Sequence, residues 1–308
     1  MPFDAMYDQG VGLNLTSKPP LVIHHSPCLD GFTAAWAMWL QYPDAEFVPG
    51  VYGQAPPDCT DRDVYLLDFS YKLEVIDAMQ RVAKSITILD HHKTAEKDLS
   101  NLWSLNDCKG VTNVTCIFDM TKSGARLAWE WFHPHTEVPM LVRAVEDRDL
   151  WRFSLAYTKE LNAVLFSYDY DFKIWGSLSR QMESIPGLAS MLEAGRAILR
   201  KQDKDVRELI GMTKMRRSIG GIMVPCANMP YTLASDAANL MAEGKPFAAT
   251  YYSDKDGFAV FSLRSREDGA DVSEIAKKYG GGGHKHAAGF RIELVNHMLG
   301  LYDYERTK

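Results

Sequence analysis

The chain has few cysteines, and their spacing excludes two classes of cross-linked protein. There are five, at widely separated positions and without a C-x-x-C pair: Cys28, Cys59, Cys108, Cys116 and Cys226. An odd, scattered set argues against a disulfide framework and against a structural zinc site. We therefore expect a protein of a reducing compartment, the cytoplasm.

Long hydrophobic runs are also missing. No stretch approaches the roughly 18 apolar residues of a membrane span. The first 20 residues contain Asp4 and Asp8 and lack the basic start and apolar core of a secretion signal. We expect neither membrane insertion nor secretion.

An excess of positive charge is absent as well. The formal net charge is −6, which is not the basic footprint of a duplex DNA binder. Any nucleic-acid partner must therefore be bound by a local group of residues and not by the charge of the whole chain. The hydrophobic content of 46% and charged content of 24% are those of an ordinary globular protein, and 308 residues suffice for about two domains.

The first half alternates short apolar runs with helical patterns, which is typical of βαβ units around a parallel sheet. The predicted helices are residues 32–42 and 73–83, and the predicted strands are residues 21–25, 45–50, 63–70 and 85–92.

The second half is helical at first and mixed later. Residues 119–151 and 158–215 show amphipathic helical patterns, the latter interrupted by Pro186 and Gly187. From residue 218 onward strand-like and helix-like runs are mixed. The predicted fold class is α/β: a parallel-sheet N-terminal domain (1–180), a helical connector (181–217) and a smaller mixed α/β C-terminal domain (218–308).

Three predicted strands end in polar residues. His24 and Asp30, then Asp68, then Asp90 with His91 and His92 follow the apolar runs LVI, YLL and ITIL. In open α/β sheets, ligands bind outside the carboxyl ends of the strands, so these side chains could converge on one site. The simpler alternative for each residue alone is a capping role.

The residue types at these strand ends suit divalent ions. Cys28 and Asp149 add to the candidate ligands. Imidazoles mixed with carboxylates suit manganese, iron or zinc, and two such ions about 3.5 to 4 Å apart can activate water and clamp a phosphoester. The pattern therefore indicates hydrolase chemistry.

Five motifs carry a resemblance to a known family. LDHHKTA (89–95) resembles the signature of the DHH phosphoesterase superfamily, which includes RecJ-type exonucleases, oligoribonucleases, cyclic dinucleotide phosphodiesterases and manganese-dependent pyrophosphatases. IHHSPCLDGFTAA resembles its first motif, H-x3-D-x-D-G, while YLLDFS and AVEDRDLW resemble its second and fourth. GGGGHKHAAGF (280–290) resembles the glycine-rich motif of the DHH-associated C-terminal domain.

The resemblance implies two Mn²⁺ ions and a role for each matching residue. His24 and Asp68 would bind the first ion; Asp30, Asp68, His91 and Asp149 would bind the second. Asp68, His91 and His92 would be catalytic, with Asp68 bridging the ions and His92 facing the substrate phosphate or leaving group. Asp147 is the alternative to Asp149, which fits the apolar register better.

Cys28 departs from the family pattern, because the first motif usually has an aspartate at this position. A thiolate there could ligate a metal and shift the preference toward softer ions. Alternatively, Cys28 is an inert small side chain beside the site.

The glycine run could bind an anion. Consecutive glycine N–H groups can form an anion-binding concavity, whereas the simpler alternative is a flexible loop. By resemblance, Gly282, Gly283, His284 and Arg264 would bind the substrate, with Arg264 and His284 at its phosphates or base.

Together these patterns predict a metal-dependent phosphodiesterase that converts short oligonucleotides or dinucleotides to nucleoside monophosphates. The expected partner is a short single-stranded oligonucleotide or a linear or cyclic dinucleotide, and a homodimer is one possible state. One alternative is a phosphomonoesterase or polyphosphate-type phosphatase on the same dimetal site. Another is a catalytically silent nucleotide-binding protein.

Overall fold

The computed structural model describes residues 18–100 and 113–294, so Cys108 lies outside the described residues. The chain forms two compact units, Met1–Ile198 and Leu199–Lys308. Among the described residues, no helix is both long enough and apolar enough to cross a membrane.

A parallel sheet organises the first unit. Its strands lie in the order β2-β1-β3-β4-β5, and every neighbouring pair is parallel. The four predicted strands are confirmed, whereas the fifth was missing from the sequence prediction. The bounds are β1 Leu21–His25, β2 Glu46–Gly50, β3 Asp63–Leu67, β4 Ser85–Asp90 and β5 Val114–Phe118.

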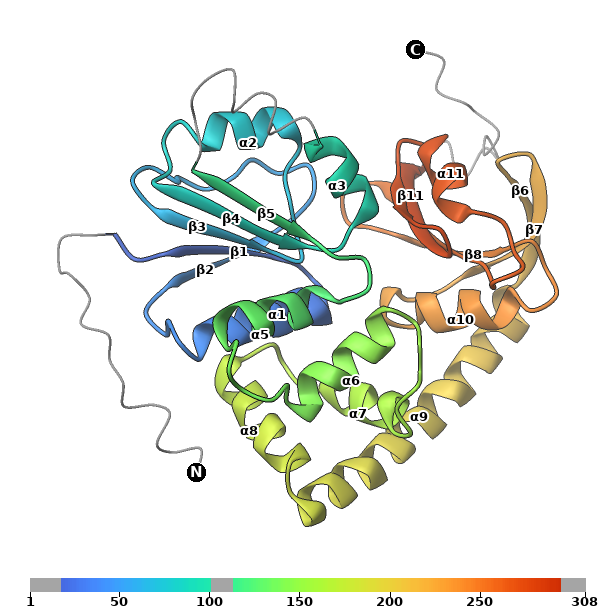
Figure 1. Cartoon of the computed structure of the whole chain (residues 1–308). Coiled ribbons are helices and arrows are strands. Elements are labelled where there is room, and N and C mark those ends of the chain that lie inside the picture. Colours follow the sequence, from blue (N-terminus) through green and yellow to red (C-terminus); the bar gives the residue numbers. More distant parts are fainter. Residues whose placement is uncertain (1–17, 101–112, 295–308) are drawn as a thin grey trace. The chain divides into compact units, whose positions relative to one another are not determined.

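The sheet has helices on both faces, which explains why its strands are almost uniformly apolar (Figure 1). Val22 packs with helices α1 (Leu29–Trp39) and α5 (Gly124–Phe132), while Ile23, the next residue, packs on the opposite face with α2 (Leu73–Met79). This alternation follows from the two-residue period of a strand. Helix α3 (Lys93–Leu99) follows β4 and contributes Leu99 to the α2 side.

Further helices extend the core around α1. They are α6 (Met140–Asp149), α7 (Thr158–Leu165), α8 (Phe172–Met182) and the start of α9 (Ile185–Thr213). The fully buried Trp175 of α8 donates a hydrogen bond from Nε1 to Thr33 Oγ1 of α1, at 3.1 Å. Pro186 and Gly187 lie in the first turn of α9, where proline is tolerated. The predicted interruption is therefore the start of a helix.

The second unit is a mixed sheet with helices. The strand order is β10-β11-β9-β8-β7-β6, in which β7 and β8 are parallel and the other pairs antiparallel. These elements, with the parallel first unit, confirm the predicted α/β class. The bounds are β6 Met215–Ile219, β7 Ile222–Asn228, η2 Tyr231–Leu233, α10 Ala234–Met241, β8 Ala248–Ser253, β9 Phe258–Arg264, α11 Val272–Lys277, β10 Gly282–His284 and β11 Ala287–Glu293.

Candidate metal centre

The carboxyl ends of three adjacent strands bring polar residues together. The register pairs His24 of β1 with Leu67 of β3, and Leu67 with Leu89 of β4. Residues that follow these positions therefore leave the sheet at the same edge, where parallel α/β sheets bind ligands. Asp68 comes directly after Leu67, and His91 comes two residues after Leu89.

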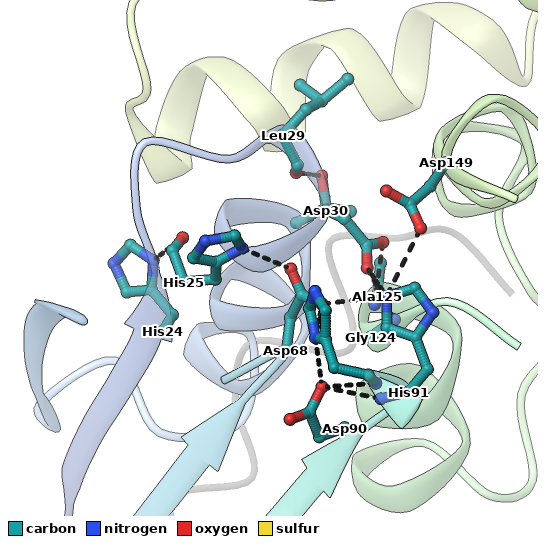
Figure 2. Close-up of polar contacts among 12 residues, drawn as sticks. His24, His25, Leu29, Asp30, Asp68, Asp90, His91, Gly124, Ala125 and Asp149 are labelled. Carbon is teal, nitrogen blue, oxygen red and sulfur yellow. Dashed lines mark hydrogen bonds and ion pairs between the residues drawn. The ribbon is translucent and has the colours of Figure 1, made fainter. Parts of the chain in front are cut away.

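Asp68 lies at the centre of the cluster (Figure 2). Its side chain is 1% exposed, with Oδ2 3.5 Å from His25 Nδ1 and Oδ1 3.1 Å from His91 Nε2. Oδ1 is also 3.9 Å from His92 Nδ1. The backbone of Asp68 has φ +54°, a left-handed conformation that aspartate adopts more readily than most residues. The carboxylate is thus aimed at three imidazoles.

His91 joins a second set of carboxylates to Asp68. Its Nε2 lies 3.4 Å from Asp149 Oδ2 and 3.8 Å from Asp30 Oδ2. In each of three overlapping groups, the possible ligand atoms lie within 4.8 Å of one another. The groups are His25, Cys28 and Asp68; Asp68, His91 and His92; and Asp30, His91 and Asp149.

Helix α5 fixes Asp30. Asp30 Oδ2 accepts a hydrogen bond from the Gly124 N–H at 2.6 Å, and Oδ1 accepts one from the Ala125 N–H at 3.1 Å. A Cβ on Gly124 would collide with Cβ of Asp68, so only glycine lets the helix approach this closely. The start of α5 therefore holds two predicted ligands in place.

Asp90 orients the histidine pair. Its Oδ1 accepts hydrogen bonds from the backbone N–H groups of His91 (2.7 Å) and His92 (3.1 Å) and lies 2.7 Å from His92 Nδ1. Carboxylates outside the ligand shell commonly orient histidines at metal sites in this way.

The electrostatics of the cluster favour a cation. Burial raises the pKa of Asp30, and the charges of Asp68 and Asp149 raise it further. Desolvation within the cluster and the charge of Asp68 also raise the pKa of Asp149, although its side chain is 28% exposed. Burial opposes the charged form of Asp68 too, but the neighbouring imidazoles of His25 and His91 hold its pKa well below the usual range.

Neighbouring carboxylates raise the pKa values of two histidines. Burial opposes the protonation of His91, yet Asp68 raises its pKa to about 10. Asp90 similarly raises the pKa of His92 to about 9 against the effect of burial. Within the described residues, the ion pairs of Asp30, Asp68 and Asp149 are all with histidines. Divalent ions would neutralise these carboxylates more fully than imidazolium groups do.

The structure does not bring His24 to the other predicted ligands. Its ring packs edge-on against Phe32, and its Nδ1 lies 3.3 Å from the carbonyl oxygen of His25. Burial lowers the pKa of His24 to about 4. His25 contacts Asp68 instead, because successive residues of a strand point to opposite sides. Motif spacing pointed to His24; the adjacent second histidine was the available signal for His25.

The two candidate aspartates of α6 have different surroundings. Asp149 lies beside His91. Asp147 turns away and accepts hydrogen bonds from Ser154 and Thr158 and from the Leu155 N–H. The geometry thus agrees with the preference for Asp149.

Cys28 lies at the cluster rather than beside it. It precedes α1 with an extended backbone, and its side chain makes no capping hydrogen bond. Its sulfur belongs to the same group of potential ligand atoms as His25 and Asp68. Burial raises the pKa of the Cys28 thiol, and Asp68 adds to that shift.

The predicted substrate-binding residues of the second unit share one end of its sheet. His284 of β10 pairs with Ala287 of β11, which pairs with Arg264 of β9. Residues directly opposite in neighbouring strands point to the same face, so His284 and Arg264 are about 10 Å apart along one row. Arg264 Nη2 donates a hydrogen bond to Ser235 Oγ at 2.6 Å, which positions its guanidinium.

The glycine run is partly a packing feature. A Cβ on Gly281 or Gly283 would collide with the backbone of β11, and Gly283 has φ +138°. Gly282 faces open space. The run therefore forms strand β10 against β11 and leaves Gly282 accessible.

Residues 232–301 match the DHHA1 domain family. The uncharacterized protein R106 of Acanthamoeba polyphaga mimivirus is 29% identical over an alignment of 306 residues, which covers 91% of this chain and 69% of the relative.

Two solved structures are similar at 14% identity. A pGpG-specific phosphodiesterase, PggH of Vibrio cholerae, has a TM-score of 0.47 and covers 92% of this chain and 96% of its own. An exopolyphosphatase-related protein of Bacteroides fragilis has a TM-score of 0.45 and covers 94% of this chain and 93% of its own. Such low scores carry no functional argument. The DHHA1 match confirms the resemblance found in the sequence for the C-terminal part of the chain: residues 232–301 form a DHHA1 domain.

Proposed function

We propose that this protein is a metal-dependent phosphodiesterase that hydrolyses short oligonucleotides or dinucleotides to nucleoside monophosphates. The observation that carries the proposal is the position of Asp68, whose two carboxylate oxygens face different histidines. A carboxylate with donors on both sides can bridge two divalent ions, and a dimetal centre is a common solution for phosphoester hydrolysis.

The donor set fits two ions. His25, Cys28 and Asp68 would hold one ion, while Asp30, Asp68, His91 and Asp149 would hold the other. Asp68 Oδ1 and His25 Nδ1 are buried without a hydrogen bond of good geometry, as expected of atoms that coordinate a cation. Nitrogen and carboxylate donors suit Mn²⁺. Bound ions would acidify a water molecule and neutralise phosphate oxygens.

The protein's own groups would orient the substrate and move protons. Asp90 fixes the His92 ring through Nδ1, so Nε2 is the atom that would contact the phosphate or protonate the leaving oxygen. In the second unit, Arg264 and His284 would bind a neighbouring phosphate or base, together with the backbone of Gly282 and Gly283. A guanidinium suits this task because its planar fork can bind phosphate through two hydrogen bonds.

The charge of the chain supports short substrates. Tight binding of long nucleic acids depends on many phosphate contacts and on counterion release. A chain with net charge −6 offers only local cationic groups, and these suffice for a dinucleotide.

The test is a substrate ladder. The purified protein is incubated with Mn²⁺ and labelled RNA and DNA oligonucleotides from dinucleotides upward, alongside cyclic dinucleotides, phosphomonoesters and polyphosphate. We expect the fastest turnover with the shortest phosphodiesters. Turnover of monoesters or polyphosphate alone would replace the proposal with a phosphatase. Nucleotide binding without any turnover would indicate a silent binding protein.

A further inference from the structure

The two sets of donors around Asp68 differ in chemical character. We name the group His25, Cys28 and Asp68 the sulfur position, and the group Asp30, Asp68, His91 and Asp149 the carboxylate position. The sulfur position offers one nitrogen, one sulfur and one oxygen donor. The carboxylate position offers one nitrogen and three carboxylates, so the two positions should prefer different ions.

Packing does not explain Cys28. Among the described residues of this unit, Cys59 and Cys116 pack with the hydrophobic core beneath α2, whereas Cys28 packs in neither core. Its side chain does not cap α1. The Cys28 sulfur therefore neither packs in a hydrophobic core nor caps helix α1.

A second observation points to a ligand at the same place. Asp68 is 1% exposed, and its Oδ1 is buried without a hydrogen bond of good geometry. His25 Nδ1 is also buried without such a hydrogen bond. Ligand atoms of both residues lie within 4.8 Å of one another and of the Cys28 sulfur. Buried polar atoms without a well-formed hydrogen bond are rare unless an ion or water molecule binds them.

We infer that the centre is a mixed-metal site in which Cys28 directs a thiophilic ion, such as Zn²⁺, Co²⁺ or Fe²⁺, to the sulfur position while Mn²⁺ occupies the carboxylate position. The inference rests on the proposed dimetal function and adds to it the identity of the two ions. Thiolate ligands favour softer divalent ions, whereas carboxylate oxygens suit Mn²⁺.

Spectroscopy on the full chain tests the inference without reference to activity. The metal-free protein is titrated with one molar equivalent of Co²⁺ and then with Mn²⁺. We expect a sulfur-to-cobalt charge-transfer band in the near ultraviolet, followed by the uptake of one Mn²⁺ per chain. Electron paramagnetic resonance and elemental analysis quantify the bound ions.

Three variants separate the thiol from other sulfur atoms. Cys28→Ser should lose the charge-transfer band, whereas Cys116→Ser, a change at another half-buried cysteine, should retain it. Cys28→Asp should bind two Mn²⁺ ions and lower the Zn²⁺/Mn²⁺ affinity ratio at least about tenfold, since even outer-shell changes typically cost 10- to 100-fold.

The outcomes distinguish this inference from the proposed function. If the wild type binds two ions without a charge-transfer band, and Cys28→Asp keeps the Zn²⁺/Mn²⁺ ratio, the sulfur is no ligand while the dimetal centre stands. If the wild type binds no divalent ion at all, both proposals fail. The wild-type spectrum alone decides the role of sulfur should a variant not fold.

Discussion

Gly124 shows how little room the centre leaves for an added methyl group. A Cβ at this position would collide with Asp68 Cβ, and Asp68 is held by the strand from which it emerges. Gly124→Ala should therefore displace the start of α5, lose the hydrogen bonds to Asp30 and reduce metal content. Overpacking of this kind costs about 1–3 kcal/mol of the free energy of unfolding.

Thermal unfolding and elemental analysis check this prediction, with Gly211→Ala as the matched control. Gly211 lies within α9, and a Cβ there meets nothing within 4 Å. The control should retain the metal and gain about 0.5–1 kcal/mol of stability, because alanine favours the helix. A Gly124→Ala protein with full metal content would contradict the assigned role of this contact.

Asp149 should matter for metal binding and not for folding. Asp149→Asn removes one of the carboxylates that surround His91. We expect metal affinity to fall at least about tenfold. The metal-free variant should be no less stable than the wild type, since the raised pKa of Asp149 means that its charge is unfavourable in the folded protein. Calorimetric metal titration and thermal unfolding measure the two effects, and unchanged affinity would remove Asp149 from the ligand set.

At the scale of elements, Asp147 ties the end of α6 to the start of α7 through its hydrogen bonds with Ser154, Leu155 and Thr158. Burial acts to raise its pKa, but these bonds lower it from 3.8 to about 2. A carboxylate whose pKa is lower in the folded than in the unfolded protein stabilises the fold at a pH above its unfolded pKa. This stabilisation is lost as the pH falls through the folded pKa.

Asp147→Asn should therefore destabilise the fold while sparing the metal centre. We expect a loss of about 1–3 kcal/mol near neutral pH, from weakened hydrogen bonds to a buried carboxylate. The difference in the free energy of unfolding between the variant and the wild type should decrease as the pH falls from 3.8 toward about 2. Denaturant unfolding at several pH values measures this, with Asp149→Asn as the control. A difference in the free energy of unfolding that stays constant with pH would mean that the charge of Asp147 does not stabilise the fold.

Some elements of the first unit could be predicted from the sequence, and others could not. Strands β1, β3 and β4 are apolar runs with polar ends, so they and their shared edge could be predicted. Motif spacing favours His24, but it does not specify which of two successive histidines on β1 faces the site, and the structure brings His25 to Asp68. Strand β5, VTCIF, carries no motif, and the sequence does not predict it.

At the scale of the whole molecule, the two units would divide the reaction between metal binding and substrate binding. Motifs spread over the chain predicted this division. The row that joins His284 to Arg264 depends on strand register, which the sequence does not specify. His25, Asp68 and His91 lie in the first unit, whereas His284 and Arg264 lie in the second.

A pair of variants tests the division. Asp68→Ala should abolish both metal binding and hydrolysis, because it removes the carboxylate common to the two positions. His284→Ala should retain both ions and raise KM about tenfold or more, since loss of one hydrogen bond to a charged phosphate costs about 1.5–3 kcal/mol. Elemental analysis and steady-state kinetics on a dinucleotide give the two readouts.

Arg291→Ala is the matched control for a cationic loss in the second unit. Arg291 pairs with Asp254 at 3.0 Å and lies over the Phe258 ring, so its loss should leave KM unchanged. Arg264→Ala should instead resemble His284→Ala, because Arg264 shares the sheet row with His284. Equal metal loss in the Asp68 and His284 variants would contradict the division, as would an equal rise in KM for the Arg264 and Arg291 variants. Unchanged KM in both the Arg264 and the His284 variants would mean that the first unit alone binds the substrate phosphate.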